Sequence, residues 1–383
     1  MTLPARAEVV IVGGGVIGTS IAFHLAEAGV TGILLLERNE LGSGSTSKAA
    51  GGVRANFSDD LNIALGARSL EAFARFGQRP GQEIDLRRVG YLFLLSTNEQ
   101  VELFEQSTRL QNAAGQPTRM LDVTEAVRLA PILSPDGLLA ACFSPNDGHC
   151  TPESVVLGYA TAARKLGARL VTGCDVLGID AIGNEIRGVR TSRGSVATST
   201  VICAAGAWSE PLAATAGVEL PVTPLRRQIV VTAAVPGLPR GLPMTIDFSS
   251  TFYFHSEGPG LLIGMSDPDE QPGFRLDRSE AWFPRLTAAM EQRAPSLLDV
   301  GLTGGWAGLY ENTPDHNALI GEAPDVGRFL YATGFSGHGF LQGPAVGEII
   351  RDLYLGRDSF VDVSPLDAGR FRNSGPRAEQ NIV

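Results

Sequence analysis

The feature that most constrains this chain is a glycine-rich stretch between an apolar run at 8–12 and a helix pattern. Gly13, Gly15 and Gly18 spell G-x-G-x-x-G at this point. The first glycine permits a tight strand-to-helix turn, the second lets the backbone approach a pyrophosphate, and the third lets the helix lie close to the strand. The pattern therefore predicts a buried parallel strand, a tight turn and a helix whose N-terminus binds an anion.

The continuation of the motif supports this interpretation. The helix is expected to end at Gly29, and a second apolar strand over 33–36 leads into Glu37. A carboxylate at this place accepts hydrogen bonds from an adenosine ribose and repels the 2′-phosphate of NADP. A lone G-x-G-x-x-G can also be an ordinary glycine-rich turn, but here all parts follow in the required order. We therefore predict dinucleotide binding, with FAD and NAD both open at this point.

Composition excludes several other classes of protein. The chain has 383 residues, 44% of them hydrophobic, and a formal net charge of −10. It is long enough for two domains, and the acidic balance argues against nucleic acid or an anionic membrane as a partner. Neither a secretory signal nor a membrane-spanning apolar run is visible. The 4 cysteines form no C-x-x-C pair and the 5 histidines are far apart. We expect reduced thiols, no metal site and a cytoplasmic protein.

A second unusual stretch, 38–54, is rich in small and hydroxylated residues. Such a segment holds no conformation by side-chain packing, but its backbone can press against a flat or anionic ligand. A flexible linker is the alternative, and the position directly after a ribose-binding acid makes it less favoured.

The rest of the chain alternates between helix and strand patterns and then becomes antiparallel. We expect helices at 60–76, 98–114, 122–130, 151–166, 279–294 and 344–355. Strands are expected at 88–95, 170–176, 200–208, 229–232, 251–255 and 261–264, with a hairpin over 186–197. The block that begins near 86 interrupts the nucleotide-binding pattern and predicts an inserted second domain. The polar tail, 365–383, is expected to be frayed.

Four separated blocks together resemble one family. They are VVIVGGGVIG with LLLER, STSKAAGGVR, VICAAGAWS, and WAGLYENTPDHNALIG with GFSGHGF. In this order, and over nearly the whole chain, they resemble the FAD-dependent D-amino-acid-oxidase-like oxidoreductases, in the branch of sarcosine oxidases and the β subunit of L-proline dehydrogenase. The resemblance implies an α/β (α+β overall) fold, with a Rossmann-type FAD-binding domain and a discontinuous, mostly antiparallel substrate domain. The expected boundaries are 1–85, 148–215 and 318–383 for the first and 86–147 and 216–317 for the second.

The same resemblance implies which residues contact FAD. The glycine turn and Glu37 hold the pyrophosphate and ribose. The stretch rich in small residues, 38–54, here called the small segment, lines the flavin. The cluster at 334–339 faces the flavin's pyrimidine edge. A mobile surface turn is the alternative for that last cluster. The implied cofactor residues are Gly13, Gly15, Val16, Ile17, Gly18, Glu37, Arg38, Ser45, Thr46, Ser47, Lys48, Gly51, Gly52, Val176, Ala205, Gly206, Trp208, Gly308, Tyr310, Gly337, His338, Gly339, Phe340, Leu341 and Gln342.

Two departures from the family bear on how the flavin is held. Monomeric sarcosine oxidases tether it through a cysteine, and the corresponding place here is Gly308. Dimethylglycine-dehydrogenase relatives use a histidine in W-H-A-A-G, where this chain has Lys48. We therefore predict non-covalent FAD.

The substrate residues are less clearly implied. Glycine and D-amino acid oxidases place a carboxylate-binding arginine where this chain has Tyr310. Arg54 is the remaining candidate for that role, with a structural salt bridge as the alternative, because a buried carboxylate needs a cation. Tyr253 and His255, on an alternating strand expected over the flavin, and His338 are candidates for substrate contact or amine deprotonation. A structural role remains open for each histidine.

The electron acceptor also remains open. Lysines that resemble the oxygen-activating and substrate-side residues of monomeric sarcosine oxidase are absent, since Leu262 and Leu341 stand near those places. Lys48 could supply the positive charge that favours reaction with O₂, and a pyrophosphate or surface role is the alternative. These departures weaken assignment as an oxidase and leave dehydrogenase activity open.

We predict an FAD-dependent amine oxidoreductase that oxidises the C–N bond of a small secondary amino acid to an imine by hydride transfer to flavin N5. The substrates considered are sarcosine, another N-substituted glycine and proline, and a sarcosine oxidase that uses O₂ is the first hypothesis. The alternatives are an L-proline dehydrogenase-like subunit with another acceptor and a partner subunit, a glycine or D-amino acid oxidase, and a non-catalytic flavin-binding partner subunit.

Overall fold

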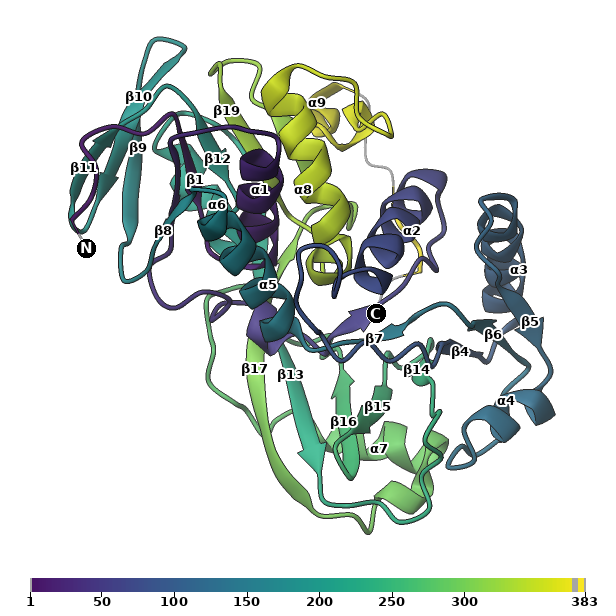
Figure 1. The fold of residues 1–383 in the computed structure, drawn as a ribbon. Coiled ribbons are helices and arrows are strands. Elements are labelled where there is room, and N and C mark those ends of the chain that lie inside the picture. The colour runs from purple at the N-terminus through teal and green to yellow at the C-terminus, as the bar shows by residue number, and fades with distance from the viewer. Residues whose placement is uncertain (1, 374–377, 382–383) are drawn as a thin grey trace.

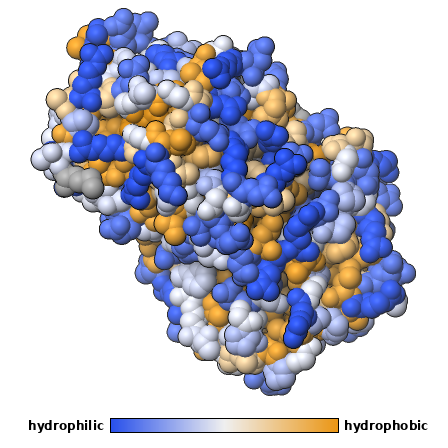
Figure 2. All heavy atoms as spheres, viewed as in Figure 1, coloured by the Kyte–Doolittle hydropathy of each residue, from blue (hydrophilic) through white to orange (hydrophobic). Residues whose placement is uncertain are grey.

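The computed structural model describes residues 2–373 and 378–381. The chain builds two halves around two large sheets, a six-stranded one and an eight-stranded one (Figure 1). The six-stranded sheet and its helices occupy the upper part of Figure 1, and the eight-stranded sheet the lower part. This combination of a mainly parallel and a mainly antiparallel sheet confirms the predicted fold class. Hydrophilic residues cover much of the face in Figure 2, with hydrophobic ones scattered between them.

The six-stranded sheet has the order β18-β19-β12-β1-β2-β8. Its strands are β1 (Val9–Val12), β2 (Ile33–Leu36), β8 (Arg169–Val171), β12 (Val201–Cys203), β18 (Leu319–Glu322) and β19 (Phe329–Thr333). Neighbours run parallel except β18, which is antiparallel to β19. β1 is buried along its whole length, as the apolar run predicts for a central parallel strand.

Both faces of this sheet are covered. Alternate residues of β1 point to opposite faces, so Val9 and Ile11 pack in the cluster formed with the helices. Val10 and Val12 join the cluster on the other face. The helices on the first face are α1 (Val16–Glu27), α2 (Asp60–Ala74), α5 (Pro152–Lys165) and α8 (Gly339–Leu355). The second face is covered by β9 (Val176–Ile182), β10 (Glu185–Thr191), β11 (Gly194–Ala197) and α6 (Ser209–Ala214).

The eight-stranded sheet has the order β17-β13-β16-β15-β14-β4-β6-β5. Its strands are β4 (Tyr91–Leu95), β5 (Arg119–Leu121), β6 (Ala140–Ser144), β13 (Thr223–Thr232), β14 (Met244–Asp247), β15 (Tyr253–Glu257), β16 (Gly260–Met265) and β17 (Leu302–Asn312). All neighbours are antiparallel except β14 and β4. The outer face packs on α4 (Val123–Leu129) and α7 (Phe283–Arg293).

Short elements and one further helix complete the described chain. The helix α3 (Asn98–Ala113) contacts β5 and β6. The short strands β3 (Gly52–Val53) and β7 (Gly148–His149) pair with each other, and α9 (Arg370–Asn373) follows late in the chain. The 3₁₀ turns are Thr46–Lys48, Gly206–Trp208, Pro295–Leu297 and Ser364–Leu366. Within the described residues, no helix combines the length and apolar character needed to cross a bilayer.

The strands of the two sheets separate along the chain. Those of the six-stranded sheet lie within 1–85, 148–215 and 318–383, and those of the eight-stranded sheet lie within 86–147 and 216–317. The division of the chain into two domains at these boundaries stays a prediction.

Several expected elements begin or end elsewhere, among them the strand expected over 170–176, which ends at Val171, and the last helix. The last helix starts at Gly339 and contains Pro344, although Pro344 was expected to begin it. A proline early in a helix removes the hydrogen bond that its own N–H would donate, and the helix can continue around it. The strand expected over 200–208 ends at Cys203, because Gly206 adopts a φ of 56° and the chain turns into a 3₁₀ helix.

The expectation of a frayed tail was wrong for the residues that the structure describes. Glu379 and Asn381 are 2% and 0% exposed. The Glu379 carboxylate accepts hydrogen bonds from the Ser58 backbone N–H and hydroxyl at 2.9 and 2.8 Å. Earlier in the tail, Arg370 forms a buried ion pair with Asp315 at 2.8 Å. In the described part of the tail, Arg370 and Glu379 thus bond to buried parts of the molecule.

Candidate functional site

A cavity of about 450 Å³ lies between the two halves of the molecule. It opens at the C-terminal ends of β1, β2 and β12, where Val12, Leu36 and Ala204 line it. Its other wall is the inner face of the eight-stranded sheet. A crevice at the carboxyl ends of parallel strands, with neighbours on either side of β1, is the expected place for a bound nucleotide.

The glycine turn at one end of the cavity is set by close backbone packing. Gly13 has a φ of 112°, and its N–H donates to the Leu36 carbonyl at 2.9 Å. A Cβ at Gly13 would collide with the Ala204 carbonyl, and one at Gly18 would collide with the Gly13 carbonyl. These contacts confirm the close strand-to-helix turn that the motif predicts.

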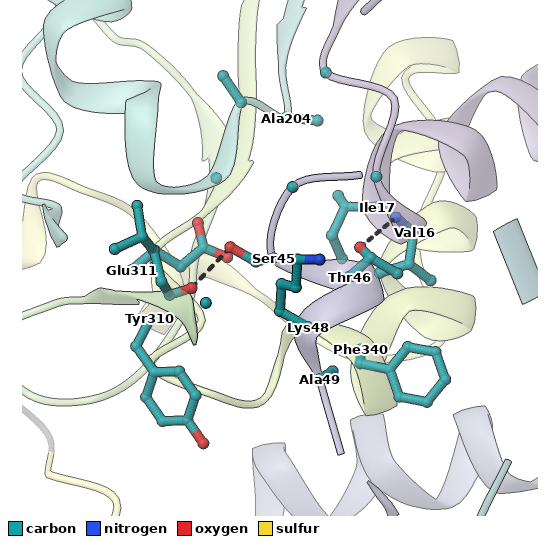
Figure 3. A pocket seen from close by; sticks show the side chains of 18 of the residues that line it. Val16, Ile17, Ser45, Thr46, Lys48, Ala49, Ala204, Tyr310, Glu311 and Phe340 are labelled. Atoms are coloured by element: carbon teal, nitrogen blue, oxygen red, sulfur yellow. Dashed lines mark hydrogen bonds between the residues drawn. The ribbon is translucent and has the colours of Figure 1, made fainter. Parts of the chain in front are cut away.

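The N-terminus of α1 faces the same cavity. Its N-cap is Gly15, with no side-chain cap and no acidic residue in the first turn. The Val16 N–H donates to the Thr46 hydroxyl at 3.1 Å, which ties the small segment to the helix (Figure 3). Gly15 and Ile17 also line the cavity. An uncapped helix start with a polar hydroxyl beside it suits a pyrophosphate.

Glu37 and Arg38 mark the next part of the cavity. The Glu37 carboxylate accepts hydrogen bonds from the backbone N–H groups of Gly14 at 2.7 Å and Asn39 at 2.8 Å. The Arg38 guanidinium lies 3.6 Å from the centre of the Trp208 ring. Val176 lines the cavity beside them. The acid and the flat side chains fit the adenosine end of a dinucleotide.

The small segment is fixed by hydrogen bonds rather than free. The Ser45 hydroxyl donates to the Leu309 carbonyl at 2.7 Å (Figure 3), and the Trp306 indole N–H donates to the Lys48 carbonyl at 3.0 Å. A Cβ at Gly308 would lie only 2.5 Å from the Lys48 Cβ. The segment therefore packs closely on β17, and these contacts disfavour the flexible-linker alternative.

The cavity brings together nearly all of the predicted site residues. It is lined by every predicted cofactor and catalytic residue except four, which are Gly18, Ser47, His255 and Gln342. Gly18 lies behind the turn, and the Gln342 amide donates to Asn62 at 3.0 Å. The His255 ring nitrogens lie 2.9 Å from the carbonyls of Ala50 and Ser256. His255 thus contacts the backbone of the small segment at Ala50 and does not line the cavity, and this position does not favour substrate contact.

Arg54 reaches the cavity but is largely engaged by the protein. Its side chain is buried and donates to the Asn56 carbonyl, to the Asn381 carbonyl at 2.7 Å and to His338 Nε2 at 3.1 Å. Burial, and secondarily the Arg54 charge, hold the pKa of His338 well below its ordinary value. His338 is therefore neutral, and its Nε2 lone pair already accepts a hydrogen bond. This contact disfavours His338 as a proton acceptor in this arrangement.

The sheet wall contributes residues that the sequence analysis missed. Successive residues of a strand point to opposite faces, and on β13 Arg227 and Ile229 line the cavity. The Arg227 guanidinium lies 5.0 Å from the centre of the Tyr310 ring. Tyr91, Met244 and Ile246 complete this wall with Tyr253. Two adjacent arginines, Arg226 and Arg227, in a strand pattern were the available signal, because one of the pair must face the sheet's inner side.

Tyrosines and one buried acid define the chemistry of this end. Burial raises the pKa of Tyr310, against the opposing charges of Arg227 and Arg54, and burial also raises the pKa of Tyr253. Burial raises the pKa of Glu311 to about 7, although it accepts hydrogen bonds from the Thr333 hydroxyl and the Gly334 N–H at 2.8 and 3.0 Å. Figure 3 shows Tyr310, Glu311 and Lys48 around the same cavity.

The fold and the cavity define a dinucleotide-binding protein whose cavity is also lined by long side chains of the eight-stranded sheet. The sequence matches the family described as FAD dependent oxidoreductase (DAO) over residues 8–353, and the chain belongs to this family. FAD is therefore its cofactor, and the residues present fit it. The uncapped α1 start and the glycine turn suit the pyrophosphate, and Glu37 suits the ribose.

Several known proteins are similar to this chain. Mitochondrial dimethylglycine dehydrogenase from Rattus norvegicus is 31% identical, over 96% of this chain and 45% of its own length. The 4-methylaminobutanoate oxidase (formaldehyde-forming) from Paenarthrobacter nicotinovorans is 30% identical, over 100% and 47%. This chain thus spans about half the length of these curated relatives. The crystal structure of L-proline dehydrogenase from P. horikoshii is 32% identical with a TM-score of 0.92, over 98% of this chain and 100% of that one.

Proposed function

We propose that the protein oxidises the C–N bond of a small secondary amino acid, such as sarcosine, another N-substituted glycine or proline, to an imine. The observation that carries this proposal is the composition of the far end of the cavity. Aromatic and apolar side chains line the sheet wall of the cavity together with the buried Arg227 guanidinium, namely Tyr91, Tyr253, Met244 and Ile246. Such an end suits a small molecule with an apolar body and one carboxylate. Relatives named for dimethylglycine, 4-methylaminobutanoate and L-proline support the same class of substrate.

The residues of the chain contribute orientation and exclusion of water. FAD, when bound, accepts a hydride from the carbon next to the amine nitrogen. The tyrosine hydroxyls of Tyr253 and Tyr310 have raised pKa values and stay protonated at neutral pH, so they can hydrogen-bond the amine or the carboxylate. An amine that enters neutral needs no base, and the engaged Nε2 of His338 is consistent with this. Non-covalent attachment of FAD is part of the proposal, since Gly308 and Lys48 offer neither cysteine nor histidine.

The first form of the proposal is a sarcosine oxidase that passes electrons to O₂. The second is an L-proline dehydrogenase-like subunit that passes electrons to an acceptor other than O₂. The similarity of the fold to that of L-proline dehydrogenase from P. horikoshii, with a TM-score of 0.92, supports this second form. A partner subunit would belong to that second form.

Product analysis separates the two forms. Purified holoenzyme is supplied with sarcosine or L-proline, and hydrogen peroxide formation is compared with reduction of an artificial dye. Peroxide formed in step with sarcosine consumption supports the oxidase. Dye reduction by proline without peroxide supports the dehydrogenase and rejects the oxidase. The Gly13→Ala variant, purified in the same way and expected to retain little FAD, controls for contaminating activity.

A further inference from the structure

Two neighbouring arginines on β13 have opposite surroundings. Arg226 lies on the outer face, where its guanidinium pairs with Glu270 at 2.8 Å and with Asp277 at 3.2 Å. Arg227 lies on the inner face, lines the cavity and donates from Nη1 to the Arg226 carbonyl at 3.2 Å. Its Nε has no hydrogen-bond partner among the residues that the structure describes. Arg226 is thus paired with acids of the protein, whereas Arg227 lines the cavity with an unpartnered Nε and without an ion pair among the described residues.

A buried guanidinium without a counter-ion is costly, and it indicates that a ligand supplies one. Three acids line the cavity, Glu37, Asp175 and Glu311, and none of them forms an ion pair with Arg227 in the part of the chain that the structure describes. Glu311 accepts hydrogen bonds from Thr333 and Gly334, and Glu37 accepts them from Gly14 and Asn39 at the adenosine end. Burial lowers the pKa of Arg227, as expected for a cation in an apolar wall.

Arg54, the other cation of this region, is in a different state. Its two terminal nitrogens donate to the carbonyls of Asn56 and Asn381 and to His338 Nε2. A substrate carboxylate could bind Arg54 well only by displacing some of these buried partners. Arg227 needs no such rearrangement.

We propose that Arg227 binds the carboxylate of the substrate, and that Arg54 is a positioning residue that holds His338 and the C-terminal segment. This inference rests on the proposed function, because it assigns the carboxylate of the proposed substrate. The planar guanidinium can bind a carboxylate through two parallel hydrogen bonds. The Tyr310 ring under Arg227 fixes the orientation of the fork.

This arrangement determines specificity as well as affinity. A free amino acid neutralises Arg227, whereas its amide or its decarboxylated analogue leaves the guanidinium buried and unpaired. The site therefore rejects uncharged analogues more strongly than the loss of one ordinary hydrogen bond would suggest.

The test uses a carboxylate that cannot be oxidised at a C–N bond. Propionate and its uncharged isostere propionamide are titrated into the holoenzyme by calorimetry, with FAD content measured in each sample. Wild type is expected to bind propionate more tightly than propionamide. Arg227→Met is expected to weaken propionate binding by about 10- to 100-fold and to remove the preference over propionamide. Arg227→Lys keeps the positive charge but loses the two-pronged guanidinium. Its affinity for propionate is expected to lie between those of wild type and Arg227→Met.

The control is Arg285→Leu, which removes one charge from an exposed pair with Asp269 in the same half of the molecule. It is expected to leave the propionate dissociation constant unchanged. An unchanged constant in Arg227→Met, or a wild type with no preference for propionate, overturns the proposal. A change confined to the flavin spectrum or reduction potential of Arg227→Met also overturns it, since Arg227 would then serve the flavin. If wild type binds propionate through Arg227 but neither sarcosine nor proline reduces the flavin, the proposed function fails and the anion site stands.

Discussion

The two ends of the cavity recognise their ligands by different means. At the nucleotide end, the contacts come from backbone N–H groups and glycines within one strand-turn-helix unit, β1 to α1. At the substrate end, they come from long side chains on β4, β13, β14, β15 and β17, which are far apart in sequence. The first end tolerates little change in the backbone, and the second can be altered one side chain at a time.

The difference separates two roles. Backbone geometry fixes where the cofactor binds, and side chains set the substrate specificity of the proposed function. The glycine turn fixes the position of the cofactor, because a Cβ at Gly13 or at Gly18 would meet a backbone carbonyl. On the proposed function, the sheet wall selects the molecule that is oxidised, because side chains such as Arg227 can be exchanged without moving the strands. The predictions below test this contrast.

The largest effect is expected for Gly13→Ala. Alanine would have to adopt a φ of 112° and its Cβ would collide with the Ala204 carbonyl, so the turn must shift. We expect FAD affinity to fall by more than about 100-fold, measured as flavin retained after gel filtration. Gly29→Ala is the matched control, because Gly29 has a φ of 86° but no atoms within 4 Å of a Cβ. It should lower stability by about 1 kcal/mol and retain FAD, and equal flavin loss in both variants would contradict this account.

Arg54→Met is expected to act mainly on stability. The change leaves buried acceptors on Asn56, His338 and Asn381 without their donor. We expect a loss of about 3 kcal/mol, seen as a lower Tm at fixed FAD concentration. The propionate dissociation constant should change less than in Arg227→Met. Unaltered stability together with lost propionate binding would identify Arg54 as the carboxylate anchor instead.

Glu379→Gln tests the buried C-terminal segment through pH. Burial, and secondarily the nearby Asp59 carboxylate, raise the pKa of Glu379 from 4.5 to about 7. The folded protein therefore holds a proton that the unfolded chain releases, and wild-type stability is lost as the pH rises through this window. Glutamine stays neutral, so the stability of the variant relative to wild type should rise by about 2 kcal/mol from pH 4.5 to 7. Chemical unfolding at several pH values measures this difference, and a difference that is flat or falls with pH would show that Glu379 is ionised in the folded protein.

The smallest effect is expected for Lys48→Met. Lys48 lines the cavity beside β17, so its charge can favour the reaction of reduced flavin with O₂. We expect reoxidation to slow by about fivefold, which corresponds to about 1 kcal/mol, with reduction by substrate unchanged in stopped-flow measurements. Lys165→Met, which removes an exposed lysine at the end of α5, should change neither rate. Equal slowing of both half-reactions would reject this role for Lys48.

The same contrast explains what the sequence could predict. The glycine turn, Glu37 and the helix end at Gly29 belong to a motif whose residue spacing can be read from the sequence, although the carbonyl that excludes a Cβ at Gly13 belongs to the distant Ala204. Arg54 is different, because its partners His338 and Asn381 lie 284 and 327 residues away. No local pattern reveals such contacts. The sequence therefore offered Arg54 as a carboxylate-binding candidate with a structural salt bridge as the alternative, and the structure shows its guanidinium hydrogen-bonded within the protein.

Arg227 illustrates the other limit. The strand pattern over 229–232 was recognisable, but β13 begins at Thr223 and includes both arginines. Which of the two faces the cavity depends on the register with β17, where Arg227 pairs with Gly308. Such a register is set by tertiary packing rather than by the composition of the strand.

The most direct test of the proposed function is anaerobic reduction of the flavin by small amino acids. Purified holoenzyme is mixed with sarcosine, L-proline and glycine in separate stopped-flow experiments, and the visible flavin absorbance is followed. The account predicts rapid bleaching with sarcosine or proline, and a weaker response to the amide of the same amino acid. A flavin that dithionite bleaches but none of these amino acids reduces would contradict oxidation of a secondary amino acid.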